Sequence, residues 1–206
     1  MINEKKERAW EKLSDLIEKC NKCPLGTHRK QAVIGYGNKN TDLMFIGEGP
    51  GAEEDEKGLP FVGRAGQLLD KIFESVGIKR EEIYITNVVK CRPPNNRVPT
   101  IEEMTSCDPY LMSQIILVNP KIIVCLGSTP TKWLLKTTEG ISKLRGKWFN
   151  WRGILIRPMF HPSYLLRNAS TKVGSPKYYT WIDIQEIKQK WMELQGEQSG
   201  KIITQR

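Results

Sequence analysis

Three stretches of the sequence combine polar or reactive side chains with a preceding apolar run. The first, GEGPGAEEDEKGLPFVGRAGQ at 47–67, places glycines and carboxylates directly after such a run. This turn looks like a phosphate-binding loop, but the chain lacks the G-x-x-x-x-G-K-[ST] pattern of a nucleotide P-loop. Gly47, Gly49 and Gly51 would instead let the backbone approach a ligand closely and present N–H groups to it.

The other two stretches begin at Asn87 and at His161. His161 stands in MFHPSYLLRN and is one of only two histidines. A lone histidine is more often structural than catalytic. Its neighbours are the apolar residues 164–166 and Arg167, the kinds of side chain with which minor-groove binders part bases and hold phosphates. A hydrophobic loop packed on its own core is the alternative interpretation.

Four of the five cysteines form a spaced set, Cys20, Cys23, Cys91 and Cys107. Cys125 stands apart in the apolar run KIIVCLG, where a small buried hydrophobic residue is expected. The spacing differs from the paired knuckles that are common around zinc, and four thiolates suit a [4Fe–4S] cluster. An iron–sulfur cluster, a zinc ion and the absence of a metal are the three interpretations at this point.

The charge balance indicates a class of partner. The chain carries 32 Lys and Arg against 23 Asp and Glu, a net charge of +9, which attracts polyanions such as nucleic acid. A merely basic protein explains the same number. No run approaches the ~20 apolar residues of a membrane helix, and the N-terminus lacks the apolar part of a secretory signal. We therefore expect an intracellular protein.

Periodicity and turn signals predict alternating strands and helices without internal repeats. This order predicts one α/β domain over 1–195, with a mostly parallel sheet flanked by helices, and a polar, flexible tail over 196–206. Because ligands bind at the carboxyl ends of parallel strands, the three stretches should meet in one cleft. The expected helices are 3–19, 65–77, 101–118, 129–136 and 175–195; the expected strands are 42–47, 82–91 and 121–127, with a hairpin over 147–160 that turns at 152–153.

Taken together, these motifs resemble a known family. In chain order they are GEGPGAEED (47–55), GLPFVGRAGQLL (58–69), ITNVVKCRPP (85–94), KLRGKW (143–148) and HPSYLLRN (161–168), with the four spaced cysteines. The chain resembles the uracil-DNA glycosylase superfamily, and most closely its iron–sulfur family 4, over residues 10 to 195. The resemblance implies that fold and a [4Fe–4S] cluster that is held by the four spaced cysteines and has a structural role.

The resemblance also implies how a base would be held. The turn at Gly47 and Gly49 would contact a base flipped out of the DNA stack and its sugar. Asn87 would pair with the N3–H and O4 of uracil through its amide. Phe61 would stack on the base, and Glu54 would fill the space near C5 where thymine carries its methyl group.

The same resemblance assigns the chemistry. His161 would donate a hydrogen bond to the uracil O2 as negative charge develops there. The best-known branch of the superfamily has an aspartate that serves the water at the position of Gly49, so Glu48 is the nearest carboxylate for that task. From the KLRGKW and HPSYLLRN motifs, the DNA contacts would come from Arg145 and Arg167 on phosphates and from Leu165 as a wedge.

We thus expect a monofunctional glycosylase that excises uracil from DNA and leaves an abasic site and free uracil. The alternatives are a broader base-excision glycosylase and a non-catalytic iron–sulfur DNA-binding module, in which His161 has no role. We expect a monomer without a membrane partner. The sequence leaves open the preference for single or double strands and any sliding-clamp partner.

Overall fold

A mixed six-stranded sheet forms the centre of the protein in a computed structural model that describes residues 2–203, and the side chains of residues 4–196. The strand order is β1-β3-β2-β4-β6-β5. The four central strands are parallel, and the short strands β1 and β5 pair antiparallel at the two edges. The mostly parallel α/β sheet is therefore confirmed. The strands are β1 (Tyr36–Gly37), β2 (Leu43–Gly47), β3 (Tyr84–Asn87), β4 (Ile122–Leu126), β5 (Phe149–Trp151) and β6 (Ile154–Met159).

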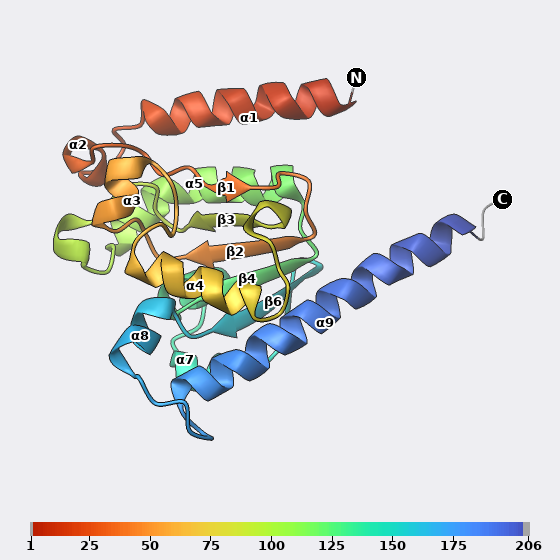
Figure 1. The fold of residues 1–206 in the computed structure, drawn as a ribbon. Helices are drawn as coiled ribbons and strands as arrows, with labels where there is room; N and C mark the ends of the chain where they lie inside the picture. The colour runs from red at the N-terminus through yellow and green to blue at the C-terminus, as the bar shows by residue number, and fades with distance from the viewer. Residues whose placement is uncertain (1, 204–206) are drawn as a thin grey trace.

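Helices cover both faces of this sheet (Figure 1). One apolar core joins α1 and α5 to alternate strand residues such as Met44 and Ile46, and a second joins α4 and α9 to Leu43 and Phe45. Burial on both faces explains why the central strands are continuously apolar. The helices are α1 (Ile2–Glu18), α2 (Leu25–His28), α3 (Ala52–Lys57), α4 (Arg64–Glu74), α5 (Ile101–Val118), α6 (Ser128–Leu135), α7 (Ile141–Leu144), α8 (Pro162–Arg167) and α9 (Pro176–Ile203), with 3₁₀ turns at Arg80–Glu82 and Pro94–Asn96.

Local signals in the sequence account for several boundaries. Thr100 Oγ1 accepts a hydrogen bond from Glu103 N (3.2 Å), and Glu103 Oε2 accepts one from Thr100 N (2.8 Å), so a capping box starts α5. The expected hairpin is confirmed, and its turn has positive φ at both Arg152 (53°) and Gly153 (85°). This left-handed pair matches the right-handed twist of the flanking strands.

Two expectations about helices are wrong. Residues 162–167 form α8 rather than a loop, with Pro162 at its first position, where its missing N–H costs nothing. The final helix does not end at 195 but continues through Ile203, so residues 196–203 are helical. A single helical glycine such as Gly196 costs only about 1 kcal/mol, and no left-handed residue stops the helix there. Residues 204–206 of the expected tail lie outside the described residues.

Within the described part of the chain, no helix is both long and apolar enough to cross a membrane.

Candidate active site

The three polar stretches meet in a cleft of about 230 Å³ at the carboxyl ends of β2, β3 and β6. We call it the base cleft. It brings together six of the seven residues expected to contact or process a base, and the seventh, Gly47, lies close to two of them, Asn87 and Phe61. The residues that line the base cleft are Glu48, Gly49, Pro50, Gly51, Glu54, Phe61, Ala65, Asn87, Pro93, Asn96, Arg97, His161 and Ser163.

Gly47 lets two of the cleft's side chains lie close to the backbone of β2. A Cβ atom at this position would come within 2.4 Å of Asn87 Oδ1 and 2.5 Å of the Phe61 ring. A Cβ at Gly49 would lie 2.7 Å from Val89 Cγ2. Real Cβ contacts are not this short, so both glycines are required by packing within the protein. The two glycines thus allow neighbouring side chains to pack closely in and behind the cleft wall.

Asn87 ends β3 with a buried side chain that is 1% exposed. Its Oδ1 atom has no hydrogen-bond partner among the described residues. A buried acceptor without a partner is costly, and such atoms are rare in folded proteins. Since Asn87 lines the base cleft, its unpaired oxygen marks a position where a ligand N–H group can bind.

Phe61 stands in the cleft wall with a strained backbone. Its φ is +53°, a left-handed conformation that residues other than glycine rarely adopt, at a cost of about 1–3 kcal/mol. The Arg80 guanidinium holds this turn by donating to the carbonyl oxygens of Pro60 and Phe61, the latter at 2.9 Å, and Asp70 fixes Arg80 at 2.7 Å. The Phe61 ring centroid lies 5.8 Å from that of His161.

Glu54 is a nearly buried carboxylate that ties two segments of the cleft wall together. Its Oε1 accepts hydrogen bonds from the N–H groups of Val62 (2.9 Å) and Gly63 (2.8 Å), and its Oε2 accepts one from Gly51 N (3.1 Å). Glu54 therefore fixes the turn that follows Phe61, besides lining the cleft itself.

The local hydrogen bonds of His161 determine its tautomer. The backbone N–H of Ser163 donates to Nδ1 at 3.1 Å, so Nδ1 carries no proton and the neutral ring carries its proton on Nε2. Burial, followed by the nearby positive charge of Arg167, lowers the pKa of His161 to about 4, against the opposing effect of Glu54. The ring is therefore a neutral Nε2–H donor at physiological pH.

Glu48 follows β2, and its carboxylate accepts a hydrogen bond from Thr129 Oγ1 at the start of α6. The carboxylate is thereby oriented at the edge of the base cleft. Sequence reasoning missed Thr129, Ser163 and Arg97. Ser163 carried a signal, because a serine two residues after a strand-end histidine can bond back to the ring.

Arg97 lines the base cleft and forms an ion pair that the sequence did not indicate. Its guanidinium binds the Glu103 carboxylate through two hydrogen bonds of 2.8 and 2.6 Å. Glu103 also takes part in the cap of α5, so this ion pair joins the cleft rim to the helix.

Two of the three expected DNA contacts have side chains that are engaged inside the protein in this structure. Leu165 is 1% exposed and packs between α4 and α9, because α8 turns Pro162 and Leu165 inward while Tyr164 and Leu166 are 37% and 40% exposed. This burial favours the interpretation of Leu165 as a core residue over its expected role as a wedge. Arg167 is exposed in the last turn of α8, as its expected role requires.

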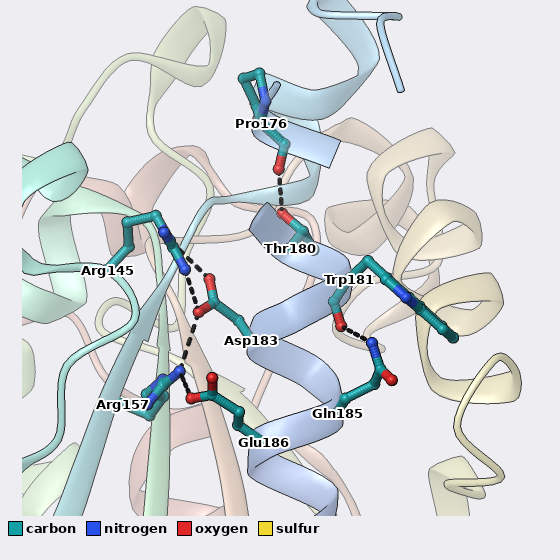
Figure 2. A network of polar contacts seen from close by, with 8 residues as sticks. All are labelled: Arg145, Arg157, Pro176, Thr180, Trp181, Asp183, Gln185 and Glu186. Carbon is teal, nitrogen blue, oxygen red and sulfur yellow. Dashed lines mark hydrogen bonds and ion pairs between the residues drawn. The ribbon is translucent and has the colours of Figure 1, made fainter. Parts of the chain in front are cut away.

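Arg145 is the second of these residues. Its Nε donates to Asp183 Oδ2 (2.9 Å) and its Nη2 to Oδ1 (2.5 Å), and the guanidinium lies 4.5 Å from the Tyr179 ring centroid. Figure 2 shows this arginine and Arg157 converging on Asp183 of α9. The Arg145 side chain is only 14% exposed, so its charge is committed to an internal ion pair rather than to phosphate.

The four spaced cysteines line a second, narrow cavity, which we call the cysteine cavity. Cys20 and Cys23 come from the segment after α1, Cys91 from the segment after β3, and Cys107 from α5. Burial raises the pKa of Cys107 to about 11 and also raises that of Cys91. Cys125 is fully buried in β4, away from this set, as expected.

Two cations flank the cysteine cavity. Arg29 Nη1 lies 3.0 Å from Cys91 Sγ, and the buried Lys90 lines the cavity as well. Burial lowers the pKa of Lys90 to about 8, against the opposing effect of Cys107 and Cys91. Over residues 4–196, no three His, Cys, Asp or Glu side chains are placed to hold a metal ion. The four cysteines nevertheless line one cavity.

Comparisons with known proteins agree with this arrangement. The profile of the uracil DNA glycosylase superfamily matches residues 34–185. The type-4 uracil-DNA glycosylase of Thermotoga maritima is 48% identical over 82% of this chain and 88% of its own length. Those of Saccharolobus solfataricus and Sulfurisphaera tokodaii are 47% and 43% identical, over 76% and 79% of this chain and 76% and 78% of their own lengths. The chain therefore belongs to the uracil-DNA glycosylase superfamily, in its type-4 branch.

Proposed function

We propose that this protein excises uracil from DNA by flipping the base into the base cleft and hydrolysing its N-glycosidic bond. The products are free uracil and an abasic site. The observation that carries this function is the unpaired Oδ1 of Asn87, buried in the same cleft as Phe61 and the Nε2–H tautomer of His161. An acceptor, an aromatic face and a neutral donor together match the edge, face and O2 of a uracil base.

Recognition of uracil requires an acceptor for N3–H and a donor for O4. The Asn87 amide offers both, and its unpaired Oδ1 takes the N3–H proton. Cytosine presents the opposite pattern, an acceptor at N3 and a donor at N4. Discrimination therefore depends on the orientation of one amide, which packing against the Gly47 backbone restricts.

Thymine is excluded by the rigidity of the cleft wall. Thymine differs from uracil by one methyl group, and a soft apolar fit discriminates such a group by only about 1–3 kcal/mol. Glu54 is held by three backbone N–H groups and cannot swing aside. A fixed, desolvated carboxylate near C5 opposes a methyl group both sterically and through lost solvation.

The chemical step separates charge, and two side chains are placed to stabilise it. As the N-glycosidic bond breaks, its electron pair moves to uracil N1 and O2, and the sugar becomes an oxocarbenium-like cation. The neutral His161 donates from Nε2 to O2 without transferring its proton. The Glu48 carboxylate, oriented by Thr129, faces the cation and accepts a hydrogen bond from the water that attacks C1′. The attacking water loses a proton to solvent by way of Glu48, and the uracil anion takes up a proton from solvent.

DNA contacts are assigned to the exposed side chains of α8. We keep Arg167 as the phosphate contact, because its side chain is exposed and its positive charge is close enough to lower the pKa of His161. The wedge that fills the gap left by the flipped base moves from Leu165 to its exposed neighbour Leu166. Both residues lie on the short helix that His161 caps.

The cysteine cavity fits an iron–sulfur cluster. Four thiols from three segments line it and two cations flank it, and four thiolates are a ligand set that suits such a cluster. Cys20, Cys23, Cys91 and Cys107 would hold a [4Fe–4S] cluster. When bound, the cluster supplies a cross-link between the end of α1, the segment after β3 and α5. The protein would act as a monomer inside the cell. Its free thiols would stay reduced there.

Single-turnover assays on labelled oligonucleotides test this function. The wild type should cleave a uracil strand and leave thymine, cytosine and hypoxanthine strands intact. Asn87→Asp should lose uracil excision, because the carboxylate removes the donor to O4 and repels that oxygen. A weak gain on cytosine is the expected side effect. Cleavage of hypoxanthine by the wild type would favour a broader base-excision glycosylase, and tight binding without any cleavage would indicate a DNA-binding module.

A further inference from the structure

Lys90 is a fully buried cation with an unusual set of partners. Its side chain is 1% exposed, and its Nζ donates to the backbone oxygen of Asn87 (2.5 Å) and to Thr86 Oγ1 (2.8 Å). Both acceptors are neutral. Across residues 4–196, no Asp or Glu carboxylate forms an ion pair with it.

A buried charge is normally paired with an opposite charge, because its transfer from water is expensive. The groups near Lys90 that can become anionic are the thiols of Cys91 and Cys107, which line the cysteine cavity with it. Thiolates that ligate a cluster would supply the missing negative charge.

Lys90 also contacts a residue of the base cleft. The carbonyl that Lys90 holds is that of Asn87, the residue whose amide reads the base edge. Thr86, the second acceptor, bonds in turn to Ile34 O (2.7 Å) and Gln114 Oε1 (3.2 Å) in the core. Lys90 thus joins the end of β3 to a fixed polar network on one side and to the cysteines on the other.

We propose that Lys90 is a positioning residue that couples the cysteine-bound cluster to uracil recognition. Its ammonium group balances the charge of the cluster thiolates and at the same time fixes the backbone that orients the Asn87 amide. This proposal rests on the proposed function, since it assumes a cluster in the cysteine cavity and base reading by Asn87. It assigns to the cluster a link with specificity, beyond its role as a cross-link.

Three variants separate the charge from the hydrogen bonds. Lys90→Met removes both, whereas Lys90→Gln removes the charge and keeps an uncharged N–H donor, one bond shorter, toward Asn87 and Thr86. Arg29→Met is the matched control, because Arg29 contacts Cys91 Sγ and Glu18 O but no residue of the base cleft. Each variant is measured for iron content, for the reduction potential of its cluster and for its affinity for free uracil.

A cation near the cluster stabilises its reduced, more negative form, so all three variants should shift the potential to more negative values. The shift should be larger in both Lys90 variants than in Arg29→Met, because Lys90 is fully buried. Lys90→Met should lose about tenfold in affinity for free uracil. Lys90→Gln should retain affinity within about threefold of the wild type, and Arg29→Met should retain it fully.

Several outcomes would overturn the proposal. A wild-type potential in Lys90→Gln would show that the lysine charge does not act on the cluster. Equal losses of uracil affinity in Lys90→Met and Arg29→Met would reduce Lys90 to a general structural role. If Lys90→Met does not fold, Lys90→Gln alone tests the proposal. The reduction potential of its cluster then tests the role of the lysine charge, and its affinity for free uracil tests the role of the hydrogen bonds. A wild-type protein without iron would instead refute the cofactor, whereas failure of wild-type uracil excision would refute the proposed function.

Discussion

The base cleft and the cysteine cavity lie at the two sides of the same strand end, but their polar groups are prepared in opposite ways. In the base cleft the key groups are neutral and preset: Asn87 Oδ1 is unpaired, and His161 carries its proton on Nε2. In the cysteine cavity the groups are ionisable and flanked by the cations Lys90 and Arg29, while burial raises the pKa of Cys91 and Cys107.

This difference indicates which kind of chemical group each cavity suits. A cleft with fixed neutral donors and acceptors selects a neutral base by the pattern of its edge, and stabilises charge only when it develops. A cavity of buried thiols beside cations stabilises a group that keeps the thiols deprotonated, as a metal does. Substitutions in each cavity can show whether the two are this distinct.

The largest expected effect is on the cysteine cavity. Cys107→Ser should abolish iron binding and the brown colour of the protein, and lower stability enough to prevent folding at elevated temperature, because the cross-link between three segments is lost. Cys125→Ala should keep iron and colour and cost about 1 kcal/mol, since Cys125 is a buried apolar group in β4. Metal analysis of both pure proteins checks this. Stoichiometric zinc without iron in the wild type would refute the cluster.

The second effect concerns chemistry in the base cleft. His161→Ala should lower the single-turnover rate on uracil DNA by about two to three orders of magnitude and leave DNA binding nearly unchanged, because its hydrogen bond strengthens only as O2 becomes negative. Rates and binding are measured separately. A wild-type rate in this variant would move the chemistry to Glu48.

The low pKa of His161 adds a dependence on pH. Folding lowers this pKa from its ordinary value of 6.5 to about 4, so between these values the unfolded chain binds a proton that the folded protein does not. Stability is therefore lost as pH falls through this window, by about 2 kcal/mol at pH 5. Denaturant unfolding at pH 7 and pH 5 should show that loss in the wild type and its absence in His161→Ala.

Much of this arrangement follows from the sequence alone. Polar stretches that begin at Glu48, Asn87 and His161, each at or just after the end of an apolar strand, are enough to predict one shared cleft in a parallel sheet, because the ends of parallel strands meet at one edge. The sequence did not show which side of α8 each residue occupies. A three-residue apolar run is compatible with several helical phases, and packing of Leu165 against α4 and α9 decides among them. Likewise, Asp183 pairs with Arg145 across 38 positions, a distance at which sequence gives no partner.

The fourth prediction separates the two neighbouring leucines of α8. Leu165→Ala should lower the free energy of unfolding by about 2–5 kcal/mol, because it opens a cavity between α4 and α9. Leu166→Ala should change stability by less than about 0.5 kcal/mol but lower excision on duplex DNA more than on single strands, since a wedge offsets the cost of unstacking. Denaturant melts and paired excision assays distinguish them. Equal losses by Leu166→Ala on both substrates would argue against a wedge.

The smallest effect compares two arginines from the motifs expected to grip phosphate. Arg167→Met should weaken DNA binding a few-fold and make the slope of log affinity against log salt shallower by about 0.9, the value for one lost phosphate contact. Arg145→Met should leave that slope unchanged, because its guanidinium is bound to Asp183 inside the protein. It should instead lower the free energy of unfolding by about 2 kcal/mol, less than the loss of a whole buried pair, since Arg157 still contacts Asp183. Salt titrations of DNA binding with both variants decide the matter: a shallower slope in Arg145→Met would mean that the ion pair opens to reach the phosphate backbone.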